Sequence, residues 1–307
     1  MQFLAGAGAA GREGVAGYFG GGIDSGGEIS GIDKITFPAD TKTTLSATLT
    51  SARSGAPGMA NSGVAGYFAG GDTPSALLNG IDKIAFPADT KTTLSATLTS
   101  ARNLMGSMAN SSVAGYFGGG NTGSTVDGID KITFPADTKT TLAAVLSSIN
   151  YLLAGMADSG VAGYFGGGFD GANNVSRIDK ITFPADSKTT LSATLTTGTR
   201  DPTAMSDSGV AGYFGGGIDS VNLSSIDKIT FPADTKTTLS ATLTSARRKL
   251  GGMADIGVAG YFGGGFAAAL VNGIDKIAFP ADTKTTLSAT LTSARSTLGA
   301  FADCAVF

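Results

Sequence analysis

The sequence predicts an all-β protein that folds as a six-bladed β-propeller, with four antiparallel strands in each blade. Residues 14–22, Gly-Val-Ala-Gly-Tyr-Phe-Gly-Gly-Gly, recur almost unchanged five more times at a spacing of 48 or 49 residues. Each copy is followed by a second block, Ile-Asp-Lys-Ile, and each unit holds four short β-prone runs. Four short strands in a unit of about 40–50 residues are typical of a propeller blade. The copies begin at Gly14, Gly63, Ser112, Gly160, Gly209 and Gly257.

The second unit shows the expected elements in order. Its first run consists of small and apolar residues, and its second of an aromatic pair followed by glycines. Its third run alternates between apolar and polar residues, and its fourth is rich in threonine. Proline leads the turn between the last two. We therefore expect strands over residues 59–65, 67–71, 81–86 and 92–98, with a turn at Gly66, a variable segment over 72–80 and a turn over 87–91.

Other architectures fit the pattern less well. Glycine, threonine and β-branched residues are too frequent for helices, and no segment keeps a period of 3.6 residues. A β-solenoid is the alternative fold, but its coils usually repeat at shorter periods.

The two ends of the chain both resemble inner strands. Residues 3–6 are similar to 152–155, so the first unit is expected to carry its own inner strand, and the tail over 299–307 resembles a seventh one. We expect the tail or the start to complete the first blade, because ring closure hides edge strands. The alternative is that the spare strand pairs with another chain and forms an oligomer. The single domain is divided into units over about 3–53, 58–102, 107–150, 155–200, 204–247 and 252–295, with 299–307 as the closing strand.

Composition argues against several function classes. Charged residues make up 15%, the net charge is −3 and no basic patch dominates, so nucleic acid is not an expected partner. No apolar run approaches the roughly 18 residues of a membrane helix, and the apolar start lacks the basic region of a secretory signal. The single cysteine, Cys304, is expected to be a small hydrophobe. The chain has no histidine, the commonest general base and metal ligand, so we expect no enzyme, metal or cofactor.

The repeated glycines and carboxylates have structural explanations. No Lys-Ser or Lys-Thr follows the glycines, which favours close strand packing over a phosphate-binding loop. Asp40 and its equivalents follow the proline and are expected to accept hydrogen bonds within the turn. Calcium binding by six such turns is the alternative.

Two segments of each unit vary while the turns stay nearly constant. One joins the second strand to the third, and the other joins the fourth strand to the next blade. Because strands alternate in direction, both variable segments lie on one face, which is how repeat folds build binding surfaces. Apolar residues on these loops, including Leu153, suit a partner contact or packing on neighbouring blades. The binding-face candidates are Ile23, Asp24, Glu28, Asp72, Leu77, Leu78, Asn121, Tyr151, Leu152, Phe169, Asp170, Asn173, Asn174, Asp219, Asn222, Arg248, Lys249, Phe266, Leu270 and Asn272.

The order of small inner strand, aromatic strand ending in Gly-Gly, aspartate-bearing strand and outer strand resembles the kelch-type propeller repeat. The resemblance covers essentially the whole chain, although Leu94 and Leu98 occupy the outer strand in place of the family's usual tryptophan. The Gly-Tyr-Phe-Gly-Gly-Gly and Ile-Asp-Lys-Ile blocks also resemble repeats in structural proteins of tailed viruses that infect marine and cyanobacterial hosts. Kelch-like propellers mostly bind other macromolecules. The copper oxidases among them need histidine ligands, which this chain lacks.

Together these features predict a non-enzymatic binding or structural module on a virion, as part of a phage tail, fibre or capsid, or on another extracellular surface. The variable face is expected to contact other proteins or surface glycans. A glycan-binding or hydrolytic propeller with its site at the channel mouth is one alternative, and a consensus-like or engineered repeat scaffold is another.

Overall fold

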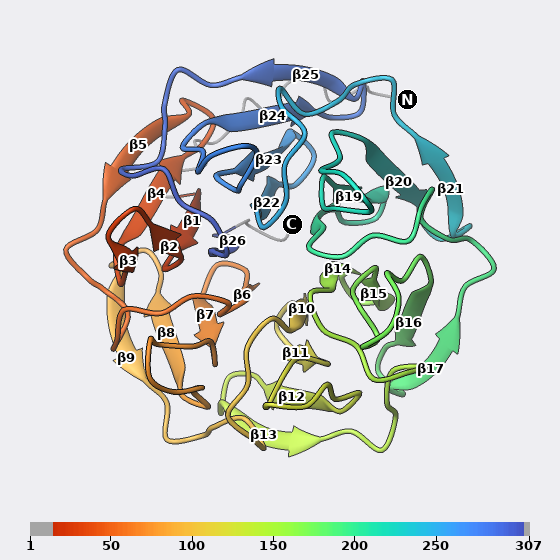
Figure 1. Cartoon of the computed structure of the whole chain (residues 1–307). Coiled ribbons are helices and arrows are strands. Elements are labelled where there is room, and N and C mark those ends of the chain that lie inside the picture. The colour runs from red at the N-terminus through yellow and green to blue at the C-terminus, as the bar shows by residue number, and fades with distance from the viewer. Residues whose placement is uncertain (1–14, 304–307) are drawn as a thin grey trace, which may run out of the picture.

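The computed structural model describes residues 15–303 and arranges them as six four-stranded antiparallel sheets around a central channel (Figure 1). The predicted six-bladed propeller is confirmed, and the solenoid alternative is wrong. Within the described residues every regular element is a strand, and none forms a helix that could cross a membrane.

Each blade follows the same order from the channel to the rim. An additional short hairpin, β2 (Ile23–Asp24) and β3 (Gly27–Glu28), stands on blade 1. Blade 1 contains β26 (Gly299–Asp303), β1 (Ala16–Gly20), β4 (Ile32–Thr36) and β5 (Thr41–Thr44); blade 2, β6 (Gly58–Asn61), β7 (Ala65–Ala69), β8 (Ile81–Ala85) and β9 (Thr90–Thr93); blade 3, β10 (Gly106–Asn110), β11 (Ala114–Gly118), β12 (Ile129–Thr133) and β13 (Thr138–Thr141); blade 4, β14 (Ala154–Asp158), β15 (Ala162–Gly166), β16 (Ile178–Thr182) and β17 (Ser187–Thr190); blade 5, β18 (Thr203–Asp207), β19 (Ala211–Gly215), β20 (Ile226–Thr230) and β21 (Thr235–Thr238); blade 6, β22 (Gly251–Asp255), β23 (Ala259–Gly263), β24 (Ile274–Ala278) and β25 (Thr283–Thr286).

The tail closes the ring. Strand β26 is the innermost strand of blade 1 and pairs antiparallel with β1, from Ala16 opposite Asp303 to Gly20 opposite Gly299. The prediction that one end of the chain completes the first blade is therefore confirmed for the tail. The predicted inner strand at residues 3–6, the apolar start and Cys304 lie outside the described residues.

The inner hairpin turns at a different place from the one predicted. In blade 2 the turn follows Asn61, where the amide of Val64 donates to the Asn61 carbonyl, and Gly66 lies inside strand β7. A Cβ atom on Gly66 would lie 2.0 Å from the Phe301 ring of blade 1. The glycine is therefore required because the neighbouring blade packs directly on the strand, and not because the chain reverses there.

The outer strand is also shorter than predicted. Strand β9 ends at Thr93, and the chain then leaves the sheet toward the next blade. Leu98, only 2% exposed, packs in the core between blades 2 and 3. The leucines at this position therefore seal the boundary between blades and do not belong to the outer strand.

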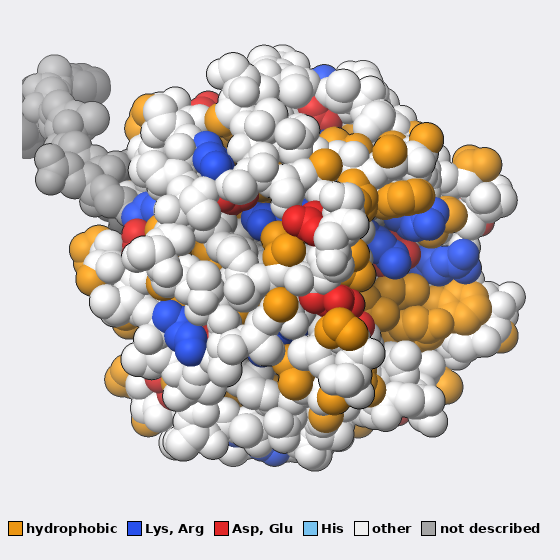
Figure 2. Space-filling view, turned by 60° about the vertical axis from the view of Figure 1, so that its left-hand side comes forward, with side chains coloured by type: hydrophobic (Ala, Val, Ile, Leu, Met, Phe, Trp, Pro, Cys, Tyr) orange, Lys and Arg blue, Asp and Glu red, His pale blue; other side chains and the backbone are white. Residues whose placement is uncertain are grey.

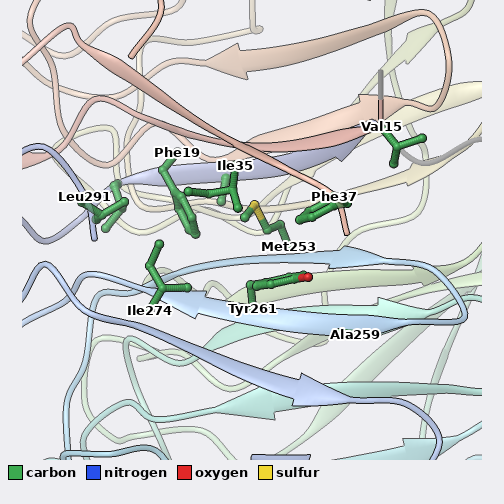
Figure 3. Packing of buried hydrophobic residues seen from close by; sticks show 11 residues of the cluster. Val15, Phe19, Ile35, Phe37, Met253, Ala259, Tyr261, Ile274 and Leu291 are labelled. Atoms are coloured by element: carbon green, nitrogen blue, oxygen red, sulfur yellow. The ribbon is translucent and has the colours of Figure 1, made fainter. Parts of the chain in front are cut away.

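The hydrophobic core lies between the blades. Figure 3 shows the boundary of blades 6 and 1, where the rings of Phe37 and Tyr261 stack at 4.9 Å between centroids. Met253 of β22 lies beside this stack. Five further clusters repeat the arrangement. The residues that hardly vary along the sequence are thus the residues that join one blade to the next.

The carboxylate after each proline also joins two blades. Asp137, at a φ of 54°, accepts hydrogen bonds from the Tyr67 hydroxyl at 2.8 Å and from Lys83 at 2.6 Å, both of the preceding blade. The prediction that this aspartate caps its own turn is wrong, because its side chain reaches across the boundary. Burial, together with the bond to Asp137, raises the pKa of Tyr67 far above its ordinary value. The equivalent carboxylates are Asp40, Asp89, Asp186, Asp234 and Asp282.

A second carboxylate of each unit is buried at the same boundaries. Asp130 accepts hydrogen bonds from the amide and hydroxyl of Thr99, from the Thr141 hydroxyl and from Arg102 at 2.9 Å. Burial alone would raise the pKa of Asp130, but these hydrogen bonds and the Arg102 charge outweigh it and lower that pKa. The same holds for Asp33, Asp82 and Asp275.

These four aspartates predict acid sensitivity. A carboxyl whose folded pKa is lowered contributes stability that is complete above the ordinary pKa of 3.8 and is lost as the pH falls through the folded value. We expect the melting temperature to fall steeply below about pH 4, and less steeply in Asp130→Asn. Thermal unfolding followed by circular dichroism from about pH 2 to pH 6 measures this. A melting temperature that stays constant below about pH 4 would contradict the expectation.

Candidate binding face

The two variable segments of each unit meet on one face of the ring, as predicted. The connection from one blade pairs with the loop between the second and third strands of the next, so Ser54 bridges Asp72 and Tyr151 bridges Phe169. These bridges tie every loop to its neighbouring blade. Equivalent bridges join Asn103 to Asn121, Arg200 to Ile218, Arg248 to Phe266 and Ser296 to Ile23.

A closed ring of backbone hydrogen bonds surrounds the channel mouth on this loop face. One residue of each connection has left-handed backbone, and its amide donates to the carbonyl of the equivalent residue one blade earlier, at 2.9–3.2 Å. These six residues contribute to the lining of a cavity of about 140 Å³ at the mouth. Their identities differ from blade to blade, so a uniform backbone carries a variable set of groups. The ring consists of Gly55, Leu104, Leu152, Asp201, Lys249 and Thr297.

The predicted binding residues all lie on this face, but few of them are freely exposed. Asn173, Asp219 and Asn272 are exposed, and the other candidates are half-buried. Leu153 is 5% exposed and packs between blades 3 and 4, so of the two alternatives for the apolar loop residues, packing on a neighbouring blade holds for this one. The half-buried residues are held by the bridges between loops and connections, and the face is therefore largely preformed.

Aromatic and basic side chains combine on the loops of blades 4, 5 and 6. The rings of Tyr151 and Phe169 meet edge to face at 5.8 Å between centroids, and the Arg200 guanidinium lies 5.5 Å from the Phe169 ring centre. Arg248 lies 5.2 Å from the Phe266 ring centre. Figure 2 shows basic and hydrophobic side chains next to each other around a hollow at the right of the view. We call Tyr151, Phe169, Arg200, Arg248 and Phe266 together the arginine sector.

The two guanidiniums of the arginine sector are positioned in the same way. Arg200 donates to the side-chain oxygen of Asn174 at 3.3 Å, and Arg248 donates to that of Asn222 at 2.9 Å. The two arginines occupy equivalent positions in successive units. Sequence reasoning selected Arg248 and both asparagines but missed Arg200, although its equivalence to Arg248 could have identified it.

One buried carboxylate lines the mouth beside the arginine sector. Asp201 is 8% exposed, and burial raises its pKa, although the charges of Lys249, Arg248 and Arg200 partly offset this. Among residues 15–303, no three Asp, Glu, Cys or His side chains lie close enough to hold a metal ion.

The opposite face has a wider channel mouth and uniform turns. A cavity of about 1190 Å³ opens there, lined mostly by small residues and methionines. The turns are linked directly, since the Ser62 amide donates to the Ser111 hydroxyl and the Ser112 amide to Asn61. The constancy of this face, including the proline turns, thus follows from contacts between blades. The contrast between the constant face and the variable loop face is therefore not by itself evidence that the loop face binds a partner.

Compared with known proteins, the chain matches no family model, and no curated protein matches it.

Proposed function

We propose that the chain is a non-enzymatic binding module that contacts its partner through the loop face. The observation that supports this most strongly is the arginine sector. It places two guanidiniums at equivalent positions of successive blades, each against a phenylalanine ring and each held by an asparagine. Arginine with aromatic residues is the combination enriched at the energetic centres of binding interfaces.

The chemistry of the arginine sector indicates the partner's surface. A guanidinium recognises oxyanions such as carboxylate or sulfate through paired N–H groups, and the rings beside it offer flat apolar area. The partner is thus a protein or glycan surface that presents acidic groups next to apolar ones. The resemblance to kelch-type repeats and to tailed-virus structural proteins supports a place on a virion or another extracellular surface.

Replacing both arginines by serine tests this proposal. Serine occurs naturally at the same position in two other units, as Ser54 and Ser296, so the double variant Arg200→Ser with Arg248→Ser is expected to keep the fold. Binding to acidic glycans on an array, and to host or cell-surface fractions, should weaken about tenfold or more, because charge-assisted hydrogen bonds are lost.

The matched control changes the opposite face. Val64 and Val113 are 46% and 45% exposed on the uniform turns, and their replacement by serine should leave binding unchanged. If the valine variant loses binding and the arginine variant keeps it, the contact face lies on the other side of the ring and the proposal is wrong.

A further inference from the structure

One position of the repeat carries a buried arginine at four of the six blade boundaries. At the boundary between blades 2 and 3, Arg102 of the connection donates through Nη1 to the carbonyls of Gly119 and Gly128. Through Nη2 it donates to the Phe117 carbonyl and to Asp130. A single planar guanidinium therefore meets four acceptors of the adjoining blade. The other arginines at this position are Arg53, Arg247 and Arg295.

The boundary between blades 4 and 5 has the same acceptors but a threonine in place of the arginine. Thr199 is buried, and its hydroxyl donates to the Thr197 carbonyl and not to blade 5. The positions that correspond to the four acceptors are Phe214, Gly216, Ser225 and Asp227. Within the described part of the chain, no side chain donates to the Gly216 or Ser225 carbonyl.

A cavity lies where the arginine side chain lies in the other blades. It has a volume of about 60 Å³, and its lining includes Thr199 and all four of those acceptor residues. One water needs only about 10–15 Å³ of such space, so the cavity has room for a larger group. Thr196 and Thr197, which also line it, are exposed, so the cavity reaches the surface at that end.

The acceptor geometry of blade 5 matches that of blade 3. Phe214 stands opposite Asp227 in the strand pair β19–β20, as Phe117 stands opposite Asp130 in β11–β12. The Gly216 amide donates to the Ser225 carbonyl at 3.1 Å, as the Gly119 amide donates to Gly128 at 3.0 Å. The backbone therefore keeps the arrangement that holds a guanidinium elsewhere in the ring.

The carboxylate in the cavity also differs from those at the four arginine boundaries by a single partner. Asp227 is 7% exposed and accepts from the Thr196 amide and hydroxyl and from the Thr238 hydroxyl, as Asp130 does from Thr99 and Thr141. The Lys236 ammonium lies 3.4 Å from the Oδ1 atom of Asp227. The Oδ2 atom, which carries the arginine bond in blade 3, faces the cavity side without a cationic partner among the described residues.

We propose that this cavity is a binding site for a guanidinium group on a short alkyl stem, supplied by a small guanidine or by an arginine side chain of a partner. A planar group with several N–H donors matches three carbonyls and one carboxylate, whereas an ammonium offers three tetrahedral donors. The boundary between blades 3 and 4 differs from this one, because a side chain there does reach the adjoining blade. Asn150 occupies the position of Thr199 and donates to the Gly167 carbonyl at 2.7 Å. The site is separate from the arginine sector and does not depend on the proposed function.

Thermal unfolding of the full chain with methylguanidinium chloride tests the site, with methylammonium chloride at equal concentration as the control. At millimolar concentrations, well below the denaturing range, wild type should show a saturating rise of about 2–4 °C in melting temperature. The rise should be absent in Thr199→Arg, whose own side chain fills the cavity, and in Asp227→Asn, which lacks the anion. Arg102→Thr should create a second cavity of this kind and show a larger rise.

Crystals soaked in the same salt provide the structural readout. Planar density that belongs to the added salt and contacts Asp227 in wild type, and that the variant's own side chain replaces in Thr199→Arg, supports the site. A capped arginine peptide that produces the same rise shows that a partner's side chain can enter as well as a small guanidine. Equal responses of wild type and both variants, or density for water alone, overturn the proposal.

Discussion

A chain truncated after Leu298 is expected to lose the cooperative unfolding transition of the intact protein. The deletion removes β26, which pairs with β1 along five residue positions and is the innermost strand of blade 1. It also removes Phe301, whose ring lies 4.7 Å from Phe68 and 5.2 Å from Tyr18 between centroids. An open propeller exposes strand edges that pair with other chains, so circular dichroism should show a broad, early transition and gel filtration should show aggregates.

Two substitutions of Phe301 separate strand pairing from side-chain packing. Phe301→Ala keeps the strand and is expected to destabilise the protein by about 3–5 kcal/mol, because a buried ring is lost. Phe301→Met places the residue of the equivalent positions, such as Met253, in the same site and should cost less than about 1.5 kcal/mol. A truncated chain that melts at the temperature of the intact protein would show that β26 is not needed for closure.

The repeat period and composition were sufficient to predict the blade count, the strand order and closure of the ring by one end of the chain, but not which end. They were not sufficient to place the inner turn, because Gly66 is a glycine for a reason that lies in another blade. The role of Asp40 was missed for the same reason, since its partners Tyr261 and Lys276 are more than 200 residues away in sequence. Local rules for turns predict that Gly66 forms a turn and that Asp40 caps one. In the structure, contact with the neighbouring blade explains why each of these residues is needed.

The candidate face was predicted from the variation of two segments among the units and from strand direction, which together indicate where variable loops emerge but not how their side chains combine. Arg200 acquires its role through Phe169 and Asn174, two residues of the loop beside it. Tyr151 likewise meets Phe169 across a blade boundary. Pairings of this kind depend on the angle between blades, and no pattern within one unit reports that angle.

The buried carboxylates offer a comparison within a single chain, because Asp130 is paired with an arginine and Asp227 is not. Asp130→Asn leaves the Arg102 guanidinium, only 4% exposed, without an anion. Removing one partner of a buried ion pair costs about 3–5 kcal/mol, so the melting temperature should fall by roughly 10 °C. Asp227→Asn should cost only about 1–2 kcal/mol, because a hydrogen bond is weakened and no buried arginine is left uncompensated.

The double variant Arg102→Thr with Asp130→Asn identifies the cause of that difference. Threonine is the natural residue at the equivalent position 199, so the double variant should be more stable than Asp130→Asn alone despite carrying one more substitution. Chemical denaturation of Asp130→Asn, Arg102→Thr, the double variant and the wild type gives the coupling energy directly. If Asp130→Asn and Asp227→Asn lose equal stability, the arginine contributes nothing beyond the threonine hydrogen bonds, and the buried ion pairs do not hold the blades together.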